Sequence, residues 1–386
     1  MDFMLSDDQL AIRDSVADLC QGFPEEYWQG CDTAGEYPQD FVEALAKSGW
    51  LAAMIPEQYG GGGASVTDAA LILETINRSG GSGASAHAQM YTMGTILRHG
   101  SEEQKQRLLP KVASNEVRLQ AFGITEPDAG SDTTRIRTFA RREGDEYVVN
   151  GNKIWTSRFQ HSDYLLLLVR TTRYEELERK TEGLSVLLVD IRTAGESIQA
   201  KPIRTMNGSE TNELFINDLR VPVANRIGEE GQGFRYILSG MNVERILVAS
   251  ESLGDGFWFV DKASAYATSR MVFGRPIGAN QGVQFPIAQA YADLEAASLL
   301  RYKAAARFDA GEQPAFEANA AKLLASRAAW AAANAAMDTF GGFGFAKEYG
   351  IERKFREARL PLIAPVNNNL VLAYIGHKVL GMPKSY

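Results

Sequence analysis

The chain is poor in cysteine and histidine. It has two cysteines, Cys20 and Cys31, and four histidines among 386 residues. These cannot form a disulfide framework, and they lack the paired spacing of a structural zinc site. Isolated cysteines are typical of a reducing compartment, so we expect a cytoplasmic protein.

Long apolar runs and an excess of basic charge are also absent. No apolar run reaches the roughly 18 residues of a membrane span, and the first residues lack the basic and apolar segments of a secretion signal. Lys and Arg total 40 against 48 Asp and Glu, for a net charge of −8. We therefore expect neither nucleic acid nor an anionic membrane as a partner.

What the chain does have is enough length and apolar content for two or three domains. Residues 1–120 follow a helical period, residues 121–232 form short β-patterned runs, and residues 233–386 return to alanine-rich helical segments. These blocks predict an α+β fold with an N-terminal helical domain, a middle β-barrel domain and a C-terminal four-helix bundle. A Rossmann fold is excluded, because it needs alternating strands and helices.

Several local structures can be predicted within these blocks. We expect a hairpin over 146–155 with its turn at Asn150–Gly151, and a solvated charged loop over 170–180. The four glycines at 60–63 predict a connecting loop. They do not predict a phosphate cradle, because no strand precedes them and no Lys-Ser/Thr follows. Long helices are predicted over 285–310 and 315–340, with a further helix beginning at Phe234 and reaching Leu253.

Four segments carry the functional information, and they are Phe122–Asp132 (FGITEPDAGSD), Asn150–Ser157 (NGNKIWTS), Thr211–Phe234, and Ser269–Gly344 with its SRMVFG and FGGFG ends. In this order they resemble the motifs of the acyl-CoA dehydrogenase family over nearly the whole chain. The scaffold also resembles that of flavin monooxygenases and nitroalkane oxidases, so fold and reaction are separate predictions.

The resemblance implies that the chain binds FAD. An isoalloxazine ring needs an apolar or aromatic wall and a few fixed hydrogen-bonding groups. The motifs imply that Phe122, Ile124 and Thr125 line the ring, and that Ser157 bonds near its N5. Trp155 would cover another part of the ring, with an ordinary sheet aromatic as the alternative.

The same resemblance implies that the other half of FAD is reached by a neighbouring subunit. Arginine suits a pyrophosphate because its planar fork donates two parallel hydrogen bonds. A homotetramer, or at least a dimer, follows from this arrangement. Asp338 stands where relatives often carry a neutral amide near the ribose. The other implied contacts are Arg270, Phe273, Gln281, Gly341 and Gly342.

The catalytic base is expected at an unusual place. The reaction needs a carboxylate of raised pKa in a dry site, but the position where many relatives carry a glutamate is Pro365. Asn242–Ala249 resembles the segment that holds the base in isovaleryl-CoA and long-chain acyl-CoA dehydrogenases. The resemblance makes Glu244 the base, with Asn242 and Arg245 as substrate-binding neighbours. The alternative is that Glu244 is a solvated helix residue.

Pro365 also removes a backbone donor, because proline has no N–H. Relatives use that N–H to polarise the thioester carbonyl. Either Ala364 or Val366 supplies the donor, or the site for the thioester oxygen is weaker in this chain. Asn367 and the two asparagines after it are candidates for substitute amides or for contacts with the flavin.

Two further residues are assigned to the substrate. Ser131 is expected to contact the pantetheine or pyrophosphate part of the thioester. Glu251 lies seven residues after Glu244, and therefore on the same helix face. It would shorten the acyl pocket or favour a polar acyl tail, unless it is a surface charge or part of an ion pair.

The predicted function is FAD-dependent α,β-desaturation of an acyl-CoA to a trans-2-enoyl-CoA, with electrons passed to an electron-transferring flavoprotein. A flavin monooxygenase, an enoyl-CoA reductase and a non-catalytic relative on the same fold remain the alternatives.

Overall fold

The computed structural model describes residues 4–384, and at Ser209 only the backbone. Contacts divide the chain into two compact units. The helical unit comprises the chain up to Ala34, Ala64–Ala84 and the chain from Asn242 onward; the sheet unit comprises Gly35–Gly63 and Ser85–Met241. Each unit joins segments that are far apart in sequence. The predicted order of helical, β and helical segments along the chain is confirmed.

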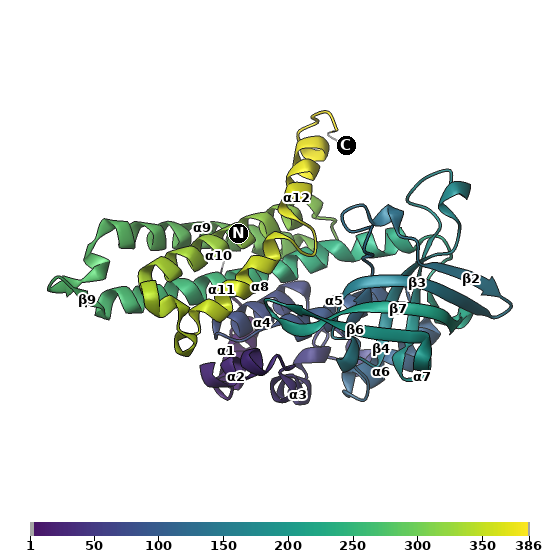
Figure 1. The fold of residues 1–386 in the computed structure, drawn as a ribbon, viewed down its shortest axis with the longest axis horizontal. Helices are drawn as coiled ribbons and strands as arrows, with labels where there is room; N and C mark the ends of the chain where they lie inside the picture. Colours follow the sequence, from purple (N-terminus) through teal and green to yellow (C-terminus); the bar gives the residue numbers. More distant parts are fainter. Residues whose placement is uncertain (1–3, 385–386) are drawn as a thin grey trace. The chain divides into compact units, whose positions relative to one another are not determined.

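The helical unit is built around long helices, and in Figure 1 α8 to α11 run alongside one another while the short α12 projects from them. The helix predicted over 315–340 is confirmed, whereas the one beginning near Phe234 runs on to Ser269. No helix among residues 4–384 is long and apolar enough to cross a membrane. The elements of this unit are α1 (Asp7–Gln21), α2 (Glu25–Ala34), α4 (Val66–Arg78), α8 (Gly233–Ser269), β9 (Met271–Val272), β10 (Arg275–Pro276), α9 (Gln281–Asp309), α10 (Ala315–Phe340), α11 (Ile351–Arg359) and α12 (Asn368–Tyr374). Helix α8 belongs to this unit from Asn242 onward.

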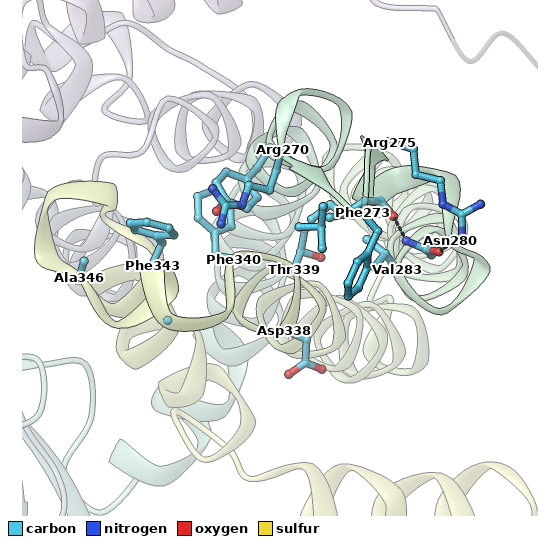
Figure 2. A pocket seen from close by; sticks show the side chains of 14 residues that line it. Arg270, Phe273, Arg275, Asn280, Val283, Asp338, Thr339, Phe340, Phe343 and Ala346 are labelled. Atoms are coloured by element: carbon cyan, nitrogen blue, oxygen red, sulfur yellow. Dashed lines mark hydrogen bonds between the residues drawn. The ribbon is translucent and has the colours of Figure 1, made fainter.

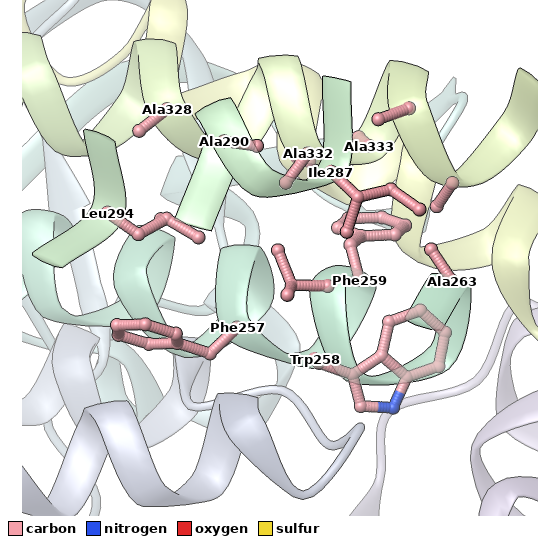
Figure 3. Packing of buried hydrophobic residues seen from close by; sticks show 14 of the residues in the cluster. Phe257, Trp258, Phe259, Ala263, Ile287, Ala290, Leu294, Ala328, Ala332 and Ala333 are labelled. Atoms are coloured by element: carbon pink, nitrogen blue, oxygen red, sulfur yellow. The ribbon is translucent and has the colours of Figure 1, made fainter. Parts of the chain in front are cut away.

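Small side chains let these helices approach closely. Alanines of α9 and α10, among them Ala290 and Ala332, share a core with the large rings of Phe259 and Trp258 on α8 (Figure 3). At Gly256 of α8 a Cβ would lie 2.3 Å from a methyl carbon of Leu294. Interiors packed this densely have no room for added atoms, so the alanine-rich composition sets the helix spacing.

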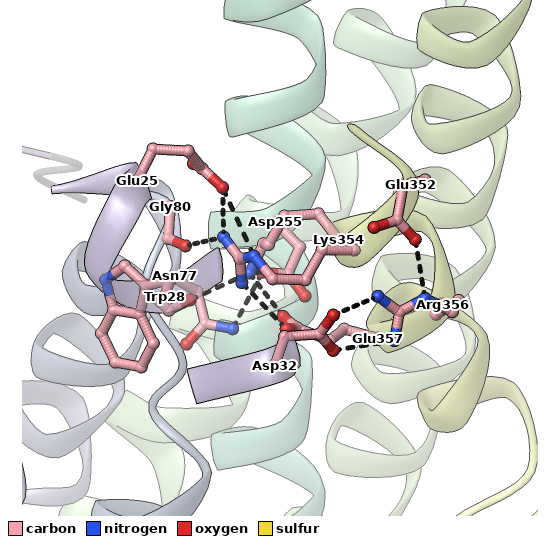
Figure 4. A network of polar contacts seen from close by, with 12 residues as sticks. Glu25, Trp28, Asp32, Asn77, Gly80, Asp255, Glu352, Lys354, Arg356 and Glu357 are labelled. Atoms are coloured by element: carbon pink, nitrogen blue, oxygen red, sulfur yellow. Dashed lines mark hydrogen bonds and ion pairs between the residues drawn. The ribbon is translucent and has the colours of Figure 1, made fainter. Parts of the chain in front are cut away.

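A buried charged network ties α11 to the other helices (Figure 4). Lys354 forms an ion pair with Asp255 of α8 and donates to the Gly81 carbonyl at 2.9 Å. Arg353 donates to Glu25 of α2 at 2.9 Å and to the Gly80 carbonyl at 2.8 Å. Burial raises the pKa of Asp255 to about 6. Removing one partner of such a network would leave an uncompensated buried charge.

The sheet unit has one path of strands, β6-β7-β3-β2-β4-β5-β8, with β1 parallel to β4. One sheet face packs on Leu108 and Leu109 of α6 through alternate residues of β4 and β5, and the other face forms a separate core. The elements of this unit are α3 (Gln39–Lys47), α5 (Ala84–His99), α6 (Glu102–Ala113), β1 (Ala121–Gly123), β2 (Phe139–Glu143), β3 (Glu146–Ser157), β4 (Tyr164–Arg170), β5 (Leu184–Asp190), α7 (Ile191–Ala194), β6 (Ile198–Thr205), β7 (Gly208–Pro222) and β8 (Arg226–Ile227). Helix α5 belongs to this unit from Ser85 onward.

The predicted hairpin turn at Asn150–Gly151 is wrong. Strand β3 runs through it, and the pairing with β7 shifts register there, which is a β-bulge. A Cβ on Gly151 would lie 2.4 Å from the Thr138 hydroxyl oxygen, so the glycine permits a close approach to the neighbouring segment. The actual turn joins β2 to β3 at Gly144, whose φ is 64°.

The stretch 170–180 was predicted to be a solvated charged loop, and this is wrong for its first residue. Arg170 ends β4 and is buried. Its guanidinium donates to the Thr134 carbonyl at 2.6 Å and to the Ile136 carbonyl at 3.1 Å. These bonds hold the segment that follows the FGITEPDAGSD motif, whereas Lys180 farther along the loop is exposed.

The glycine loop at 60–63 is held by its own backbone. Gly60 donates to the Glu57 carbonyl at 2.8 Å, and Gly63 to the Ile55 carbonyl at 2.8 Å. The N–H groups of Gly61 and Gly62 are bonded to carbonyls as well. All four donors are therefore used within the protein, which agrees with a connecting loop and leaves none for a phosphate.

Candidate active site

The ring-side residues lie in the sheet unit, where the structure joins two of the sequence motifs. The Thr125 carbonyl accepts from the Ile154 N–H at 2.9 Å, which ties the segment after β1 to β3. Phe122 lies on β1, with its ring 5.8 Å from that of Tyr91. The two motifs predicted to surround a flavin ring therefore share one backbone framework.

Trp155 lies within a second register shift of β3, between Lys153 and Thr156, and Ser157 follows it. Trp155 is 56% exposed and has a φ of 62°, a conformation that a bulky residue rarely adopts. Such conformations persist where the surrounding structure enforces them and are common at functional sites. The Ser157 hydroxyl lies 3.0 Å from that of Thr211. An exposed indole suits a residue that covers a ligand better than an ordinary sheet aromatic.

A buried ion pair that the sequence reasoning missed supports this framework. Lys153 Nζ lies 2.9 Å from Glu126 Oε1 and also donates to the Ile124 carbonyl at 2.9 Å. Glu126 accepts from the backbone N–H groups of Thr138 and Arg137 as well. The available signal was a lysine inside a β-patterned run, only two residues before Trp155.

The protonation of this pair follows from burial and charge. Burial lowers the pKa of Lys153 to about 8, although Glu126 opposes that shift. Burial alone would raise the pKa of Glu126, but the Lys153 ammonium and the hydrogen bonds from Thr138 and Arg137 bring it below its ordinary value. The lowered pKa favours the anionic form of Glu126, which holds Lys153, and through it the Ile124 carbonyl, in place.

A pocket of about 770 Å³ lies in the helical unit, where α8, the β9–β10 hairpin and the end of α10 meet (Figure 2). It brings together four residues predicted to bind FAD, namely Arg270, Phe273, Asp338 and Gly342. The Arg270 guanidinium lies 5.6 Å from the centre of the Phe343 ring. Phe273 is fully exposed, with a φ of 50°.

Two other predicted residues lie beside this pocket. Gln281 is exposed at the start of α9, directly after Asn280, which lines the pocket. Gly341 ends α10 with a φ of 57°. A Cβ on either Gly341 or Gly342 would meet nothing within 4 Å, so backbone is open to a ligand there.

The lining fits the adenine and pyrophosphate part of FAD. Aromatic rings offer surfaces for a purine, and a guanidinium offers paired donors for phosphate oxygens. The Asp338 carboxylate can only accept hydrogen bonds, which suits ribose hydroxyl groups. The departure from the family pattern at Asp338 therefore still has a role open to it.

The residues predicted to act on the substrate lie on α8, within the helical unit. Asn242 is buried, and its amide oxygen lies 3.5 Å from an Nη atom of Arg245. Burial lowers the pKa of Arg245, while the charges of Glu244 and Tyr374 act in the opposite direction. Glu244 therefore faces a cation that is itself largely withdrawn from water.

Lys322 of α10 is a second cation near Glu244, and the sequence reasoning missed it. Its side chain is fully buried. Burial and, to a smaller extent, the charge of Arg245 lower its pKa to about 8, while Glu244 opposes the shift. A lysine in an alanine-rich, buried helix was the signal that could have identified it.

Lys322 also holds the loop where relatives carry their glutamate. Its Nζ donates to the Val366 carbonyl at 2.7 Å and to the Asn368 side chain at 3.0 Å. Pro365 follows a cis peptide bond. The Asn367 side chain accepts from the Leu370 N–H at 2.9 Å and caps α12, so its oxygen is engaged in the helix cap.

Glu251 and Ser131 occupy different surroundings. Glu251 is half-buried on α8, and a Cβ on Gly83 would lie 3.4 Å from its Oε1. It therefore packs against the segment before α5 and is not fully solvated. Ser131 is exposed at the end of the FGITEPDAGSD motif, as a contact for an extended ligand must be.

Comparison with known proteins agrees with this arrangement. The N-terminal, middle and C-terminal domains of acyl-CoA dehydrogenases match residues 6–116, 121–219 and 231–378. The chain is 32% identical over 389 residues to the acyl-CoA dehydrogenase fadE12 of Mycobacterium bovis, covering 100% of this chain and 99% of that protein. It is 34% identical over 353 residues to a 3-(aryl)acrylate reductase of Clostridium sporogenes, covering 90% and 92%.

A solved structure extends the comparison to three dimensions. A glutaryl-coenzyme A dehydrogenase in complex with glutaryl-CoA superposes with a TM-score of 0.93 and 31% identity, over 100% of this chain and 98% of that one. Together with the three domain matches, this similarity shows that the chain belongs to the acyl-CoA dehydrogenase family of FAD-dependent oxidoreductases.

Proposed function

We propose that this chain oxidises an acyl-CoA thioester to its trans-2-enoyl-CoA, with Glu244 as the base. The observation that carries the proposal is the charge arrangement in the helical unit. Glu244 interacts with the buried Lys322 and the half-buried Arg245, while Pro365 occupies the position of the more common glutamate. A carboxylate next to fixed cations is available as an anion to accept a proton.

The residues of this chain divide the work between binding and proton transfer. Arg270, Phe273 and Gly342 would hold the adenine and pyrophosphate part of FAD, and Trp155 and Ser157 its ring. Bound FAD supplies the acceptor for the hydride that leaves the β-carbon. Other residues proposed for the cofactor are Phe122, Ile124, Thr125, Gln281, Asp338, Gly341 and Asn367.

The proton step belongs to Glu244. Its carboxylate would take the α-proton, and negative charge would then develop on the thioester oxygen. Backbone N–H groups after Pro365, at Val366 or Asn367, are the donors we propose for that oxygen, because donors aimed at developing charge lower the barrier. Ser131, Asn242 and Arg245 would hold the CoA part.

The acyl group is proposed to be short or polar, because Glu251 lies on the same face of α8 as Glu244, seven residues later, and is partly withdrawn from water. A carboxylate there shortens an apolar pocket and can accept a hydrogen bond from a polar tail. A marked preference for long unsubstituted acyl chains would contradict this assignment.

We further propose a cytoplasmic homotetramer that passes electrons to an electron-transferring flavoprotein. A second candidate function is the reverse reaction, reduction of an enoyl-CoA at the same site. The similarity to a 3-(aryl)acrylate reductase favours it. Comparing oxidation of acyl-CoA with reduction of the matching enoyl-CoA decides between the two.

The test is anaerobic bleaching of the flavin absorbance across a panel of acyl-CoAs. We expect Glu244→Gln to keep its FAD and to lose about 10²- to 10⁴-fold in flavin reduction rate, since general bases typically contribute that much. Glu295→Gln, which changes an exposed glutamate of α9, is the matched control.

Other outcomes would replace the proposal. A loss below about tenfold in a Glu244→Gln protein that keeps FAD rules out this base. Colourless protein that does not take up FAD would indicate a non-catalytic relative, and fast reoxidation by O₂ with an oxygenated product would indicate a monooxygenase.

A further inference from the structure

We propose that Lys322 is a positioning residue that fixes the 364–368 segment and places a positive charge beside Glu244; this inference rests on the proposed function. Its ammonium is fully buried in the middle of α10. It bonds to two points of that segment, the Val366 carbonyl at 2.7 Å and the Asn368 amide oxygen at 3.0 Å.

The first role is mechanical. Asn368 is also anchored to α10 by its side-chain nitrogen, which donates to the Ser326 hydroxyl at 3.1 Å. Ser326 lies one turn after Lys322, so two successive turns of α10 hold the start of α12. This double attachment sets where the loop after Pro365 lies.

The carbonyl bond also orients an amide. In a trans peptide the C=O and N–H groups point to opposite sides. When Lys322 holds the Val366 carbonyl, it turns the following N–H, that of Asn367, away from α10. Because Pro365 supplies no donor, the direction of the remaining amides decides whether the thioester oxygen can be bound.

The second role is electrostatic. The charged and titratable groups that act on Lys322 are Glu244 and Arg245 of α8, and Tyr374 of α12 acts on Arg245 in turn. Glu244 thus has two cations nearby, one from its own helix and one from α10. A nearby cation favours the ionised carboxylate. The lowered pKa of Lys322, about 8, agrees with an ammonium that burial and Arg245 both disfavour.

The experiment separates these roles in the FAD-loaded full chain. Lys322→Met removes both the hydrogen bonds and the charge, Lys322→Arg keeps the charge, and Asn368→Ala removes one attachment while keeping the ammonium. Arg327→Met removes an exposed cation from the same helix and is the matched control. Hydrogen exchange over residues 360–370 reports the attachment, and the pH profile of flavin reduction reports the charge.

In Lys322→Met we expect the backbone amides of residues 364–368 to exchange their hydrogens faster than in the wild type. We also expect its flavin to be reduced about 10- to 100-fold more slowly, a loss typical of misplaced reacting groups. The acidic limb of its rate profile should move to higher pH, because the base has lost a neighbouring cation. Asn368→Ala should show faster exchange with the acidic limb unmoved. Lys322→Arg should keep the limb in place.

Two results would overturn the inference. The first is that the amides of residues 364–368 exchange at the same rate in Lys322→Met as in the control Arg327→Met. That result would mean that the Lys322 ammonium does not hold the segment. The other is an unshifted acidic limb in a Lys322→Met protein that keeps its FAD. If no acyl-CoA bleaches the wild-type flavin, the proposed function fails, and the exchange measurement still decides whether Lys322 holds the segment.

Discussion

At the scale of single residues, the features that decide the site are buried charges. Lys153 holds the Ile124 carbonyl and Glu126, and Lys322 holds Val366 and Asn368. Both lysines are fully buried, so each needs its partners to offset the loss of hydration. Neither was identified from the sequence as functional, because a lysine is charged and exposed in most settings.

Breaking the Lys153–Glu126 pair should destabilise the protein strongly. We expect Lys153→Met to lower the free energy of unfolding by about 3–5 kcal/mol, because Glu126 is left as an uncompensated buried anion. Denaturant unfolding measures this, and the exposed Lys180→Met is the control. The double variant Lys153→Met with Glu126→Gln should recover part of the loss. A Lys153→Met protein as stable as Lys180→Met would contradict the importance of the pair.

His99 should make stability depend on pH. Burial, together with the charges of Arg98, Arg235 and Lys105, lowers its pKa to about 4, while its ring stacks on Tyr236. The folded protein therefore keeps His99 neutral where the unfolded chain, with a pKa near 6.5, takes up a proton. Linkage then lowers the free energy of unfolding as pH falls from about 6.5 to about 4.

Replacing His99 tests that dependence. Unfolding of His99→Gln, followed by denaturant between pH 4 and pH 7, should show a flatter slope than the wild type. His377→Gln, which changes a half-buried histidine of the helical unit, should keep the wild-type slope. Equal slopes in all three proteins would mean that His99 is not held neutral.

At the scale of elements, close helix contacts decide the packing. Gly254 of α8 faces α4, where a Cβ would lie 2.4 Å from the Glu74 carbonyl oxygen and 2.9 Å from the Arg78 nitrogen. These are backbone atoms, which cannot move aside as the end of a flexible side chain could. At Gly282 of α9 a Cβ would meet nothing within 4 Å.

The two glycines should therefore respond in opposite ways to alanine. Gly254→Ala should lower the free energy of unfolding by about 1–3 kcal/mol, as overpacked cores do. Gly282→Ala should leave it unchanged or raise it by up to about 1 kcal/mol, because alanine favours a helix. Thermal and denaturant unfolding of both variants measures these changes. An equal change in the free energy of unfolding at the two positions would contradict the prediction.

The predictions of helices and strands were correct where the local sequence pattern fits only one structure. The helix over 315–340 and the short strands within residues 121–232 were predictable from composition and period. The hairpin at Asn150–Gly151 was wrong, because the same dipeptide also suits a bulge, and the pairing with β7 decides between them. That partner lies about sixty residues later in the sequence.

At the scale of the whole molecule, the helical unit leaves large apolar side chains exposed. Leu299 on α9 is 51% exposed and Leu324 on α10 is 42% exposed, and the fully exposed Phe273 lines the pocket proposed for FAD. Exposed apolar groups of this size often mark contacts with other proteins. They agree with the predicted assembly in which a neighbouring subunit completes the FAD site.

The assembly can be measured directly. Sedimentation should give a mass about four times the 42.3 kDa of one chain. Leu324→Glu should lower that mass and the FAD content together, because charge opposes burial in an interface. Met4→Glu, at another exposed apolar residue, should change neither. A Leu324→Glu protein that becomes monomeric yet keeps FAD would show that one chain binds the cofactor by itself.

The sequence by itself determined the order of helical and β segments, the family and the residues that its motifs carry, because these depend on local pattern and residue type. Only the tertiary structure decided which charges are buried, such as Lys153 and Lys322, and that Asn150–Gly151 forms a bulge. It also gathered Arg270, Phe273, Asp338 and Gly342 around one pocket. The physical reason is that burial, strand pairing and pocket formation depend on residues far apart in the chain, which local patterns do not record.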